Sequence, residues 1–228
     1  ARQADMYIHT LAGPEIAVAS TKAYTAQISV MYLLAFRFAF ARGMIGLQRM
    51  KELTAQALSA PAAIQRVIDR KNECQFIASK LVNADNLFFI GRSFDYALSL
   101  EGSLKLKEIS YIHSEAYAAG ELKHGPISLI EDGTVVFSVV TQSALYEKTI
   151  SNMVEVKSRG AKLFGLTTYG NYAMEDVADF TVYTPRIDNL FAASLSVVPL
   201  QLLSYYVSVG KGYDVDKPRN LAKSVTVE

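Results

Sequence analysis

Apolar and polar residues are arranged along the chain in blocks that predict strands and helices in alternation. Four short, mostly apolar runs are typical of strands buried on both faces. They cover residues 87–90, 134–140, 162–166 and 180–183, and a further strand pattern lies at 7–10. Longer segments with helical spacing lie at about 21–41, 47–58, 61–81, 95–111, 145–159 and 190–209, before an irregular tail.

Residues with special backbone preferences mark the ends of these elements. Ser20 or Thr21 can cap the first long helix, and Gly43 and Gly160 stand where two helices are expected to end. Pro61 suits the first turn of a helix, because proline has no N–H to lose there. We therefore expect a new helix to begin at Pro61.

The alternation predicts an α/β fold, with a mainly parallel sheet flanked by helices in three layers, of the flavodoxin-like or Rossmann-like kind. Residues 82–212 hold one complete unit. Residues 1–43 look like the end of a truncated first unit, 44–81 like connecting helices, and 213–228 form a C-terminal tail. The chain has no initiator Met and enters a strand pattern at once, so we expect it to begin inside a longer protein.

Composition narrows the function classes. Half of the 228 residues are apolar and 20% are charged, which is typical of a folded chain. The net charge of +1 gives no electrostatic reason to expect nucleic-acid binding. Cys74 is the single cysteine, so an internal disulfide is excluded, and His9, His113 and His124 lack the spacing of metal ligands. We expect neither a metal nor a cofactor.

Two apolar stretches raise the question of a membrane span. Residues 189–210 are long enough to cross a bilayer, but they include Pro199 and Gln201 and lack a basic flank. A helix buried in a soluble domain is the better interpretation. Residues 28–41 are interrupted by Arg37 and predict a core or interface helix. No membrane partner is expected, and the expected location is the cytoplasm.

The helix expected at 95–111 has the most informative charges. Glu101, Lys105 and Glu108 are spaced by four and then three residues, so they share one face. One interpretation is a solvated face with an ordinary Glu–Lys pair. The other is a lysine and a carboxylate held together in a cleft, where the carboxylate can move protons beside a carbonyl group.

His124 stands directly before Gly125-Pro126, which places an imidazole on an irregular turn. Such turns often carry catalytic groups, but the pattern alone is also that of a loop histidine without a chemical role. In the tail, Lys223 lies in a segment whose Val-Thr-Val pattern suggests packing. A packed lysine can serve as a Schiff-base amine, whereas a surface lysine needs no function.

Two loops precede helix N-termini, where free N–H groups attract anions. The loop from Gly13 to Lys22 is rich in hydroxyl groups, and Gly91-Arg92-Ser93 follows a strand. For Ser93 or Asp95, helix capping alone is a sufficient explanation. Neither loop matches a dinucleotide fingerprint or a P-loop, so nucleotide binding gains little support.

Taken together, four segments resemble the glucosamine-6-phosphate synthase family, also called the isomerizing glutamine–fructose-6-phosphate aminotransferases. The segments are EIAVASTKA at 15–23, EGSLKLKEISYIHSEAYAAGELKHGP at 101–126, VPLQLL at 198–203 and DKPRNLAKSVTVE at 216–228. The similarity spans essentially the whole chain and corresponds to the C-terminal part of the isomerase half, which is built from two sugar isomerase (SIS) domains. The central block and the tail are its most specific parts.

The resemblance implies a role for each matching residue. Glu108 would move a proton between C1 and C2 of the sugar, and Lys105 would manage a hydroxyl proton beside it. His124 would open the sugar ring from the neighbouring subunit of a homodimer, and Lys223 would form a Schiff base with fructose 6-phosphate. The residues implied to line the sugar site are Val18, Ser20 and Ala222. The tail would thus contribute to the active site.

Parts of the family pattern are absent from this sequence. The glutaminase domain with its nucleophilic cysteine is missing, and Cys74, in a helical stretch, is no substitute. The loops that hold the sugar phosphate belong to the first SIS domain and lie upstream. We therefore expect this chain alone to be inactive or nearly so, because phosphate binding orients the substrate. A sugar-phosphate-sensing SIS module, or a related deglycase or amino-sugar isomerase, remains the alternative.

Overall fold

The apolar runs form the centre of a five-stranded sheet. The computed structural model describes residues 3–223, and the strands in it are β1 (Asn86–Gly91), β2 (His113–Ala118), β3 (Val135–Val140), β4 (Lys162–Thr168) and β5 (Phe180–Thr184). Their order is β2-β1-β3-β4-β5, and every neighbouring pair is parallel. This is the order of flavodoxin-like sheets, so the predicted fold class is confirmed.

A row of phenylalanines crosses one face of the sheet and explains how its helices pack. Phe89 is in register with Phe137, Phe137 with Phe164, and Phe164 with Phe180. Consecutive ring centroids lie 5.5, 6.5 and 5.1 Å apart. The first three rings are fully buried beneath helices, so the row forms the floor of the larger hydrophobic core.

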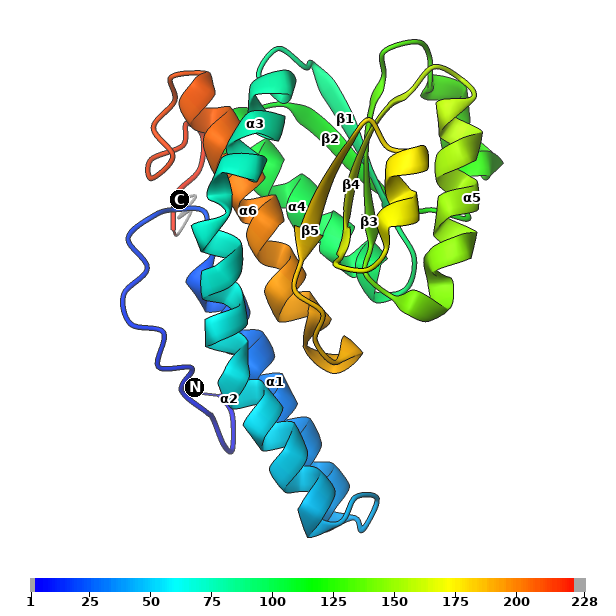
Figure 1. The fold of residues 1–228 in the computed structure, drawn as a ribbon. Coiled ribbons are helices and arrows are strands. Elements are labelled where there is room, and N and C mark those ends of the chain that lie inside the picture. The colour runs from blue at the N-terminus through cyan, green and yellow to red at the C-terminus, as the bar shows by residue number, and fades with distance from the viewer. Residues whose placement is uncertain (1–2, 224–228) are drawn as a thin grey trace.

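Helices cover the sheet on both sides (Figure 1). The phenylalanine face packs against α3 (Lys71–Leu81), α4 (Phe94–Ser110) and α6 (Ala192–Gly210). The other face packs against α5 (Tyr146–Lys157) and short 3₁₀ turns. These turns are η1 (Leu122–His124), η2 (Pro126–Leu129) and η4 (Tyr172–Asp176), while η3 (Ser143–Leu145) and η5 (Asn189–Phe191) precede α5 and α6.

Two antiparallel helices, α1 (Lys22–Ala41) and α2 (Leu47–Asp69), form a hairpin that extends beyond the sheet (Figure 1). Both α1 and the 189–210 segment are long and apolar enough to cross a membrane. The most apolar window of 189–210 is 67% buried, as expected of a core helix, but that of α1 is only 6% buried. Within the described residues α1 is therefore not a core helix, and its interface role stays a prediction.

The expected strand at residues 7–10 is wrong. This segment is irregular and exposed, and no described strand lies beside it to satisfy its backbone. The helix boundary at Pro61 is also wrong, because α2 continues through Pro61 to Asp69. Proline fixes a helix-compatible φ and removes only one donor, so the helix tolerates it here.

The sequence pattern missed β2 and therefore counted four strands in the complete unit. His113, Glu115 and Tyr117 alternate with small residues, so the segment has no apolar run. It is an edge strand that pairs only with β1 in the described sheet, and one of its faces is partly solvated. Edge strands of this kind tolerate polar residues that a central strand does not.

Candidate active site

Lys105 lies on α4, the helix that packs closely against both the sheet and α6. Gly102, one turn earlier on α4, has room for no side chain: a Cβ there would stand 3.0 Å from Leu200 and 3.2 Å from Phe89. Lys105 itself is only 5% exposed, because the segment before α1, the end of α6 and the tail surround it. Its Nζ donates to Glu108 Oε2 at 2.5 Å and lies 3.8 Å from Glu101 Oε1.

The three charges therefore form a cluster in which two carboxylates share one ammonium. Burial raises the pKa of the Glu101 carboxyl; the Lys105 cation opposes this shift and the Glu108 carboxylate adds to it. Tyr24 on α1 faces the same cluster, and burial, followed by repulsion from Glu101, raises its pKa to about 12. The cluster therefore has two carboxylates for one ammonium, and Lys105 is the counter-charge that offsets the repulsion between Glu101 and Glu108.

A pocket of about 160 Å³ opens beside Lys105. Four separate parts of the chain line it: the segment before α1, the C-terminal half of α4, the C-terminal half of α6 and the tail. The lining residues are Ala17, Ala19, Thr21, Lys105, Ile109, Gln201, Tyr205, Val215 and Asp216. The pocket is thus built by segments that lie up to about 200 positions apart in the sequence.

Gln201 is the polar residue of α6 in this pocket, and the sequence analysis assigned it no role. Its Nε2 is buried and has no hydrogen-bond partner among the described residues. A buried amide without a partner is costly, so its presence in an otherwise apolar helix needs a reason. The signal available in the sequence was one amide in the VPLQLL stretch, which the resemblance quoted without assigning it a role.

The tail is fixed against the end of α4. The backbone N–H of Arg219 donates to the Tyr111 hydroxyl at 2.7 Å, and the Arg219 guanidinium lies 4.1 Å from the centre of the Tyr111 ring. The Tyr213 ring packs on the same tyrosine at 4.9 Å. Tyr111 itself adopts a left-handed backbone, with φ of 60°, where it ends the helix. We call Tyr111, Tyr213 and Arg219 the tyrosine clamp.

Beyond the clamp, the tail reaches the segment that precedes α1. The Val18 N–H donates to the carbonyl of Asp216 at 3.1 Å. Lys223 then places its Nζ 3.3 Å from the Val18 carbonyl and 3.4 Å from the Ser20 hydroxyl. The structure therefore brings Lys223, Val18 and Ser20 together. Ala222 precedes Lys223 and is exposed, and residues 224–228 lie outside the described part of the chain.

The N-terminus of α1 is capped from within the chain. Thr21 occupies the cap position as expected, but its side chain makes no capping hydrogen bond. Instead, the Glu15 carboxylate accepts from the Thr21 N–H at 2.9 Å and from the Ala23 N–H at 3.2 Å. The anion expected at this helix terminus is therefore the protein's own carboxylate.

His124 does not join these groups within one chain. It lies in η1, after the carboxyl end of β2, and is exposed. Glu108 lies fourteen residues into α4, which runs back from the carboxyl end of β1, so it lies roughly 21 Å along that helix. The imidazole and the Lys105–Glu108 pair thus belong to opposite ends of the sheet.

The described residues contain no group of three or more His, Cys, Asp and Glu side chains that could hold a metal ion. Cys74 is buried in α3. Burial, together with the Glu73 carboxylate, raises the pKa of its thiol to about 12. Such a thiol is not a nucleophile near neutral pH.

Comparison with known proteins adds the following. The SIS domain family model matches residues 80–210. The chain is 54% identical over 227 residues to the isomerizing glutamine–fructose-6-phosphate aminotransferase of Clostridium tetani and 52% identical over 228 residues to that of Clostridium acetobutylicum. Each alignment includes 100% of this chain, which spans 37% and 38% of the length of these two relatives.

Among solved structures, the C-terminal domain of the glucosamine-fructose-6-phosphate aminotransferase from Francisella tularensis is similar, with a TM-score of 0.89 and 36% identity. That alignment covers 95% of this chain and 61% of the other. A glucosamine-6-phosphate deaminase from Thermotoga maritima has a TM-score of 0.68 and 27% identity; the alignment covers 94% of this chain and 59% of the deaminase chain. The resemblance drawn from the sequence motifs is confirmed.

Proposed function

The chain belongs to the SIS domain family, and on that premise we propose that it is part of the isomerase half of a glutamine–fructose-6-phosphate aminotransferase. The whole enzyme makes glucosamine 6-phosphate from fructose 6-phosphate and ammonia released from glutamine. The observation that carries the proposal is the position of Lys223 beside Val18 and Ser20, in the segment that also lines the Lys105 pocket.

In this proposal Lys223 is the amine that condenses with the C2 carbonyl of the open-chain ketose, with loss of water. Ammonia then displaces the lysine from the imine. Glu108 removes the proton from C1 and returns one to C2, which converts the ketose imine into the aldose amine. The imine acidifies the C1 proton, so a carboxylate is a strong enough base. Lys105, at 2.5 Å, balances the charge of Glu108 and exchanges a proton with the adjacent sugar hydroxyl.

Ring opening is assigned to His124 of a second subunit. Within one chain the imidazole lies at the other end of the sheet from Glu108, so a homodimer that donates His124 across its interface supplies the missing group. A cytoplasmic location belongs to the same proposal.

The domain organisation is proposed on the same grounds. Residues 1–43 are the end of a first SIS domain, 44–81 the connecting helices, 82–212 the second SIS domain and 213–228 the active-site tail. The exposed apolar surface of α1 supports this division, because a first SIS domain would cover it. The loops that hold the sugar phosphate belong to that first domain. The 228-residue chain alone is therefore expected to make no glucosamine 6-phosphate at a useful rate.

Borohydride trapping tests the role of Lys223 in the longer enzyme. Reduction in the presence of fructose 6-phosphate should attach the sugar phosphate to Lys223, and peptide mass spectrometry should locate it there. The variant Lys223→Arg should trap nothing, whereas Lys217→Arg, an exposed lysine of the same tail, should trap as the wild type does. Trapping at another lysine, or undiminished product formation by Lys223→Arg, would remove the enzymatic assignment.

Glu108→Gln tests the proton transfer separately. This variant should still hydrolyse glutamine and still form the Lys223 adduct, but sugar product should fall by about a hundredfold or more, since positioned acid–base groups contribute about 10²–10⁴ in rate. A normal rate of product formation would show that another group moves the proton.

A further inference from the structure

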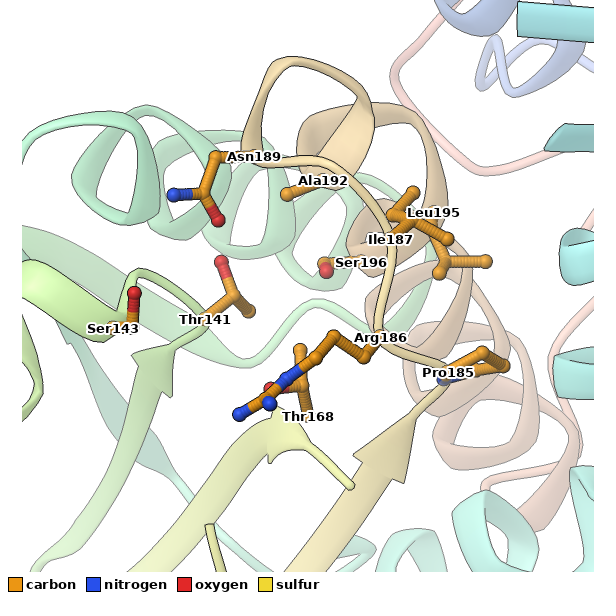
Figure 2. Close-up of a pocket in the computed structure, with 10 residues that line it drawn as sticks. All are labelled: Thr141, Ser143, Thr168, Pro185, Arg186, Ile187, Asn189, Ala192, Leu195 and Ser196. Carbon is orange, nitrogen blue, oxygen red and sulfur yellow. The ribbon is translucent and has the colours of Figure 1, made fainter. Parts of the chain in front are cut away.

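We propose that this chain has a second, separate binding site, for a small phosphate monoester, at the carboxyl edge of its sheet. A pocket of about 270 Å³ lies there, between the loops that follow β3, β4 and β5 and the start of α6 (Figure 2). It shares no lining residue with the Lys105 pocket. Parallel sheets bind their ligands at this edge.

The lining provides hydrogen-bond donors for an anion. Figure 2 shows Thr168, Arg186 and Ser196 around the same hollow, with Ser143 and Asn189 at its margin. The Arg186 guanidinium, beside Thr168, has no ion-pair partner among residues 3–223. An arginine of this kind presents a planar fork of donors that matches phosphate oxygens.

Ser196 gives an independent reason to expect a ligand. The residue is only 1% exposed, its hydroxyl opens into the pocket, and no hydrogen bond joins that hydroxyl to another side chain or carbonyl of residues 3–223. An occupant that accepts from Ser196 would supply the partner that these residues do not.

The surrounding backbone and charges favour an anion over a cation. Ala192 and Leu195 in the first turn of α6 line the pocket, so the N-terminal turn of that helix lies beside it, and the turn η5 that leads into α6 is capped by Asp188. No carboxylate lines the pocket. Two carboxylates belong to residues beside the lining, and both are already bonded. Asp95 accepts from the Thr141 N–H at 2.8 Å, the Thr141 hydroxyl at 2.5 Å and the Gln142 N–H at 3.3 Å. Asp188 accepts from the Leu190 N–H at 3.0 Å and lies 3.8 Å from Arg49.

The volume of the pocket and the residues that line it indicate the class of ligand. The volume is at the small end for ligand pockets, which suits a sugar phosphate better than a nucleotide. Ile187 and Leu195 provide apolar contacts, while Asn189 and Ser143 provide polar groups for hydroxyls. The phosphate is assigned to Arg186 and Ser196.

The test is a titration of the 228-residue chain followed by ¹H–¹⁵N correlation spectra. The probes are inorganic phosphate, glucose 6-phosphate and uncharged glucose. The two phosphates should shift the backbone amides of Ser143, Thr168 and Ala192, with glucose 6-phosphate binding at least as tightly as phosphate, and glucose should shift none of them. Arg186→Ala should weaken both phosphates about tenfold, the loss expected for one charged hydrogen bond. Arg66→Ala, which removes an exposed arginine on α2, should bind as the wild type does.

The outcomes separate this site from the proposed active site. Absence of shifts around the carboxyl-edge pocket, or unchanged binding by Arg186→Ala, overturns the inference. Weaker binding of glucose 6-phosphate than of phosphate overturns the assignment to a sugar phosphate. Shifts confined to the surroundings of Lys105 and Gln201 also overturn it, while leaving the proposed function intact, because these residues lie toward the other end of α4 and α6.

Discussion

Lys105→Met should destabilise the chain in a strongly pH-dependent way. The substitution keeps an unbranched side chain of similar length but removes the ammonium that Glu101 and Glu108 share. Their side chains are 15% and 22% exposed, so water replaces the lost partner poorly. Two carboxylates would then face each other without a counter-charge.

The size of the effect follows from the geometry. A pair of unit charges about 4 Å apart interacts by about 4 kcal/mol at an effective dielectric constant of 20, and Lys105 has one contact at 3.8 Å and another at 2.5 Å. Removing the lysine also removes the cost of burying it, so the net loss is smaller than the sum. We expect the free energy of unfolding to fall by about 3–5 kcal/mol at pH 7.5.

The sign of the pH dependence distinguishes charge from packing. Burial already raises the pKa of Glu101, and loss of Lys105 raises it further. A carboxyl whose pKa is higher in the folded than in the unfolded state costs stability above that pKa, and the cost disappears as the pH falls below the unfolded value. Wild type and Lys105→Met should therefore converge toward pH 4.

Urea unfolding at pH 4, 5.5 and 7.5 measures this convergence. Lys107→Met is the matched control, since Lys107 lies on the same helix and is exposed; it should change the free energy of unfolding by less than about 0.5 kcal/mol. A loss for Lys105→Met that is equal at all three pH values would show that lysine packing, and not the shared charge, stabilises the site.

Three further predictions concern single buried groups. Cys74, whose thiol pKa is about 12, should resist iodoacetamide at pH 8 in the folded chain and react only after unfolding; rapid labelling of the native chain would contradict its burial. Asp95→Ala should lower the free energy of unfolding in urea by about 3 kcal/mol, because the Thr141 and Gln142 N–H groups lose a charged acceptor, and a loss below about 1 kcal/mol would refute this. Gln201→Leu should leave the stability in urea unchanged or raise it by about 1 kcal/mol, since the amide Nε2 has no partner among the described residues; a clear loss would show that Gln201 holds the pocket together instead.

Local patterns predicted most of the fold, because most elements are buried on the side that their pattern indicates. Runs such as 87–90 and 134–140 became central strands, and an apolar stretch broken by polar residues became α6. Two of the failures share one physical cause. The segment 7–10 and strand β2 depend on whether a neighbouring strand exists, which local sequence does not state. The third, the boundary at Pro61, failed because packing holds α2 together through a proline that local preference would place at a helix start.

The residues of the candidate site were likewise predictable from the sequence only where the signal is local. The spacing of Glu101, Lys105 and Glu108 placed them on one helix face, since three or four residues make one turn. The approach of Lys223 to Val18 joins positions 205 residues apart and was available only through the resemblance. Gln201 escaped notice because its pattern is that of a core helix, and only the three-dimensional structure reveals that its amide Nε2 has no partner within residues 3–223.

The tyrosine clamp limits the positions that Lys223 can reach. Arg219 is anchored on Tyr111, and Lys223 follows it by four positions, a tether that spans at most roughly 14 Å when fully stretched. The tether therefore confines the Lys223 amine to a small volume around the end of α4. A carbonyl compound that enters this volume encounters the Lys223 amine at a high effective concentration, because the short tether keeps the amine nearby.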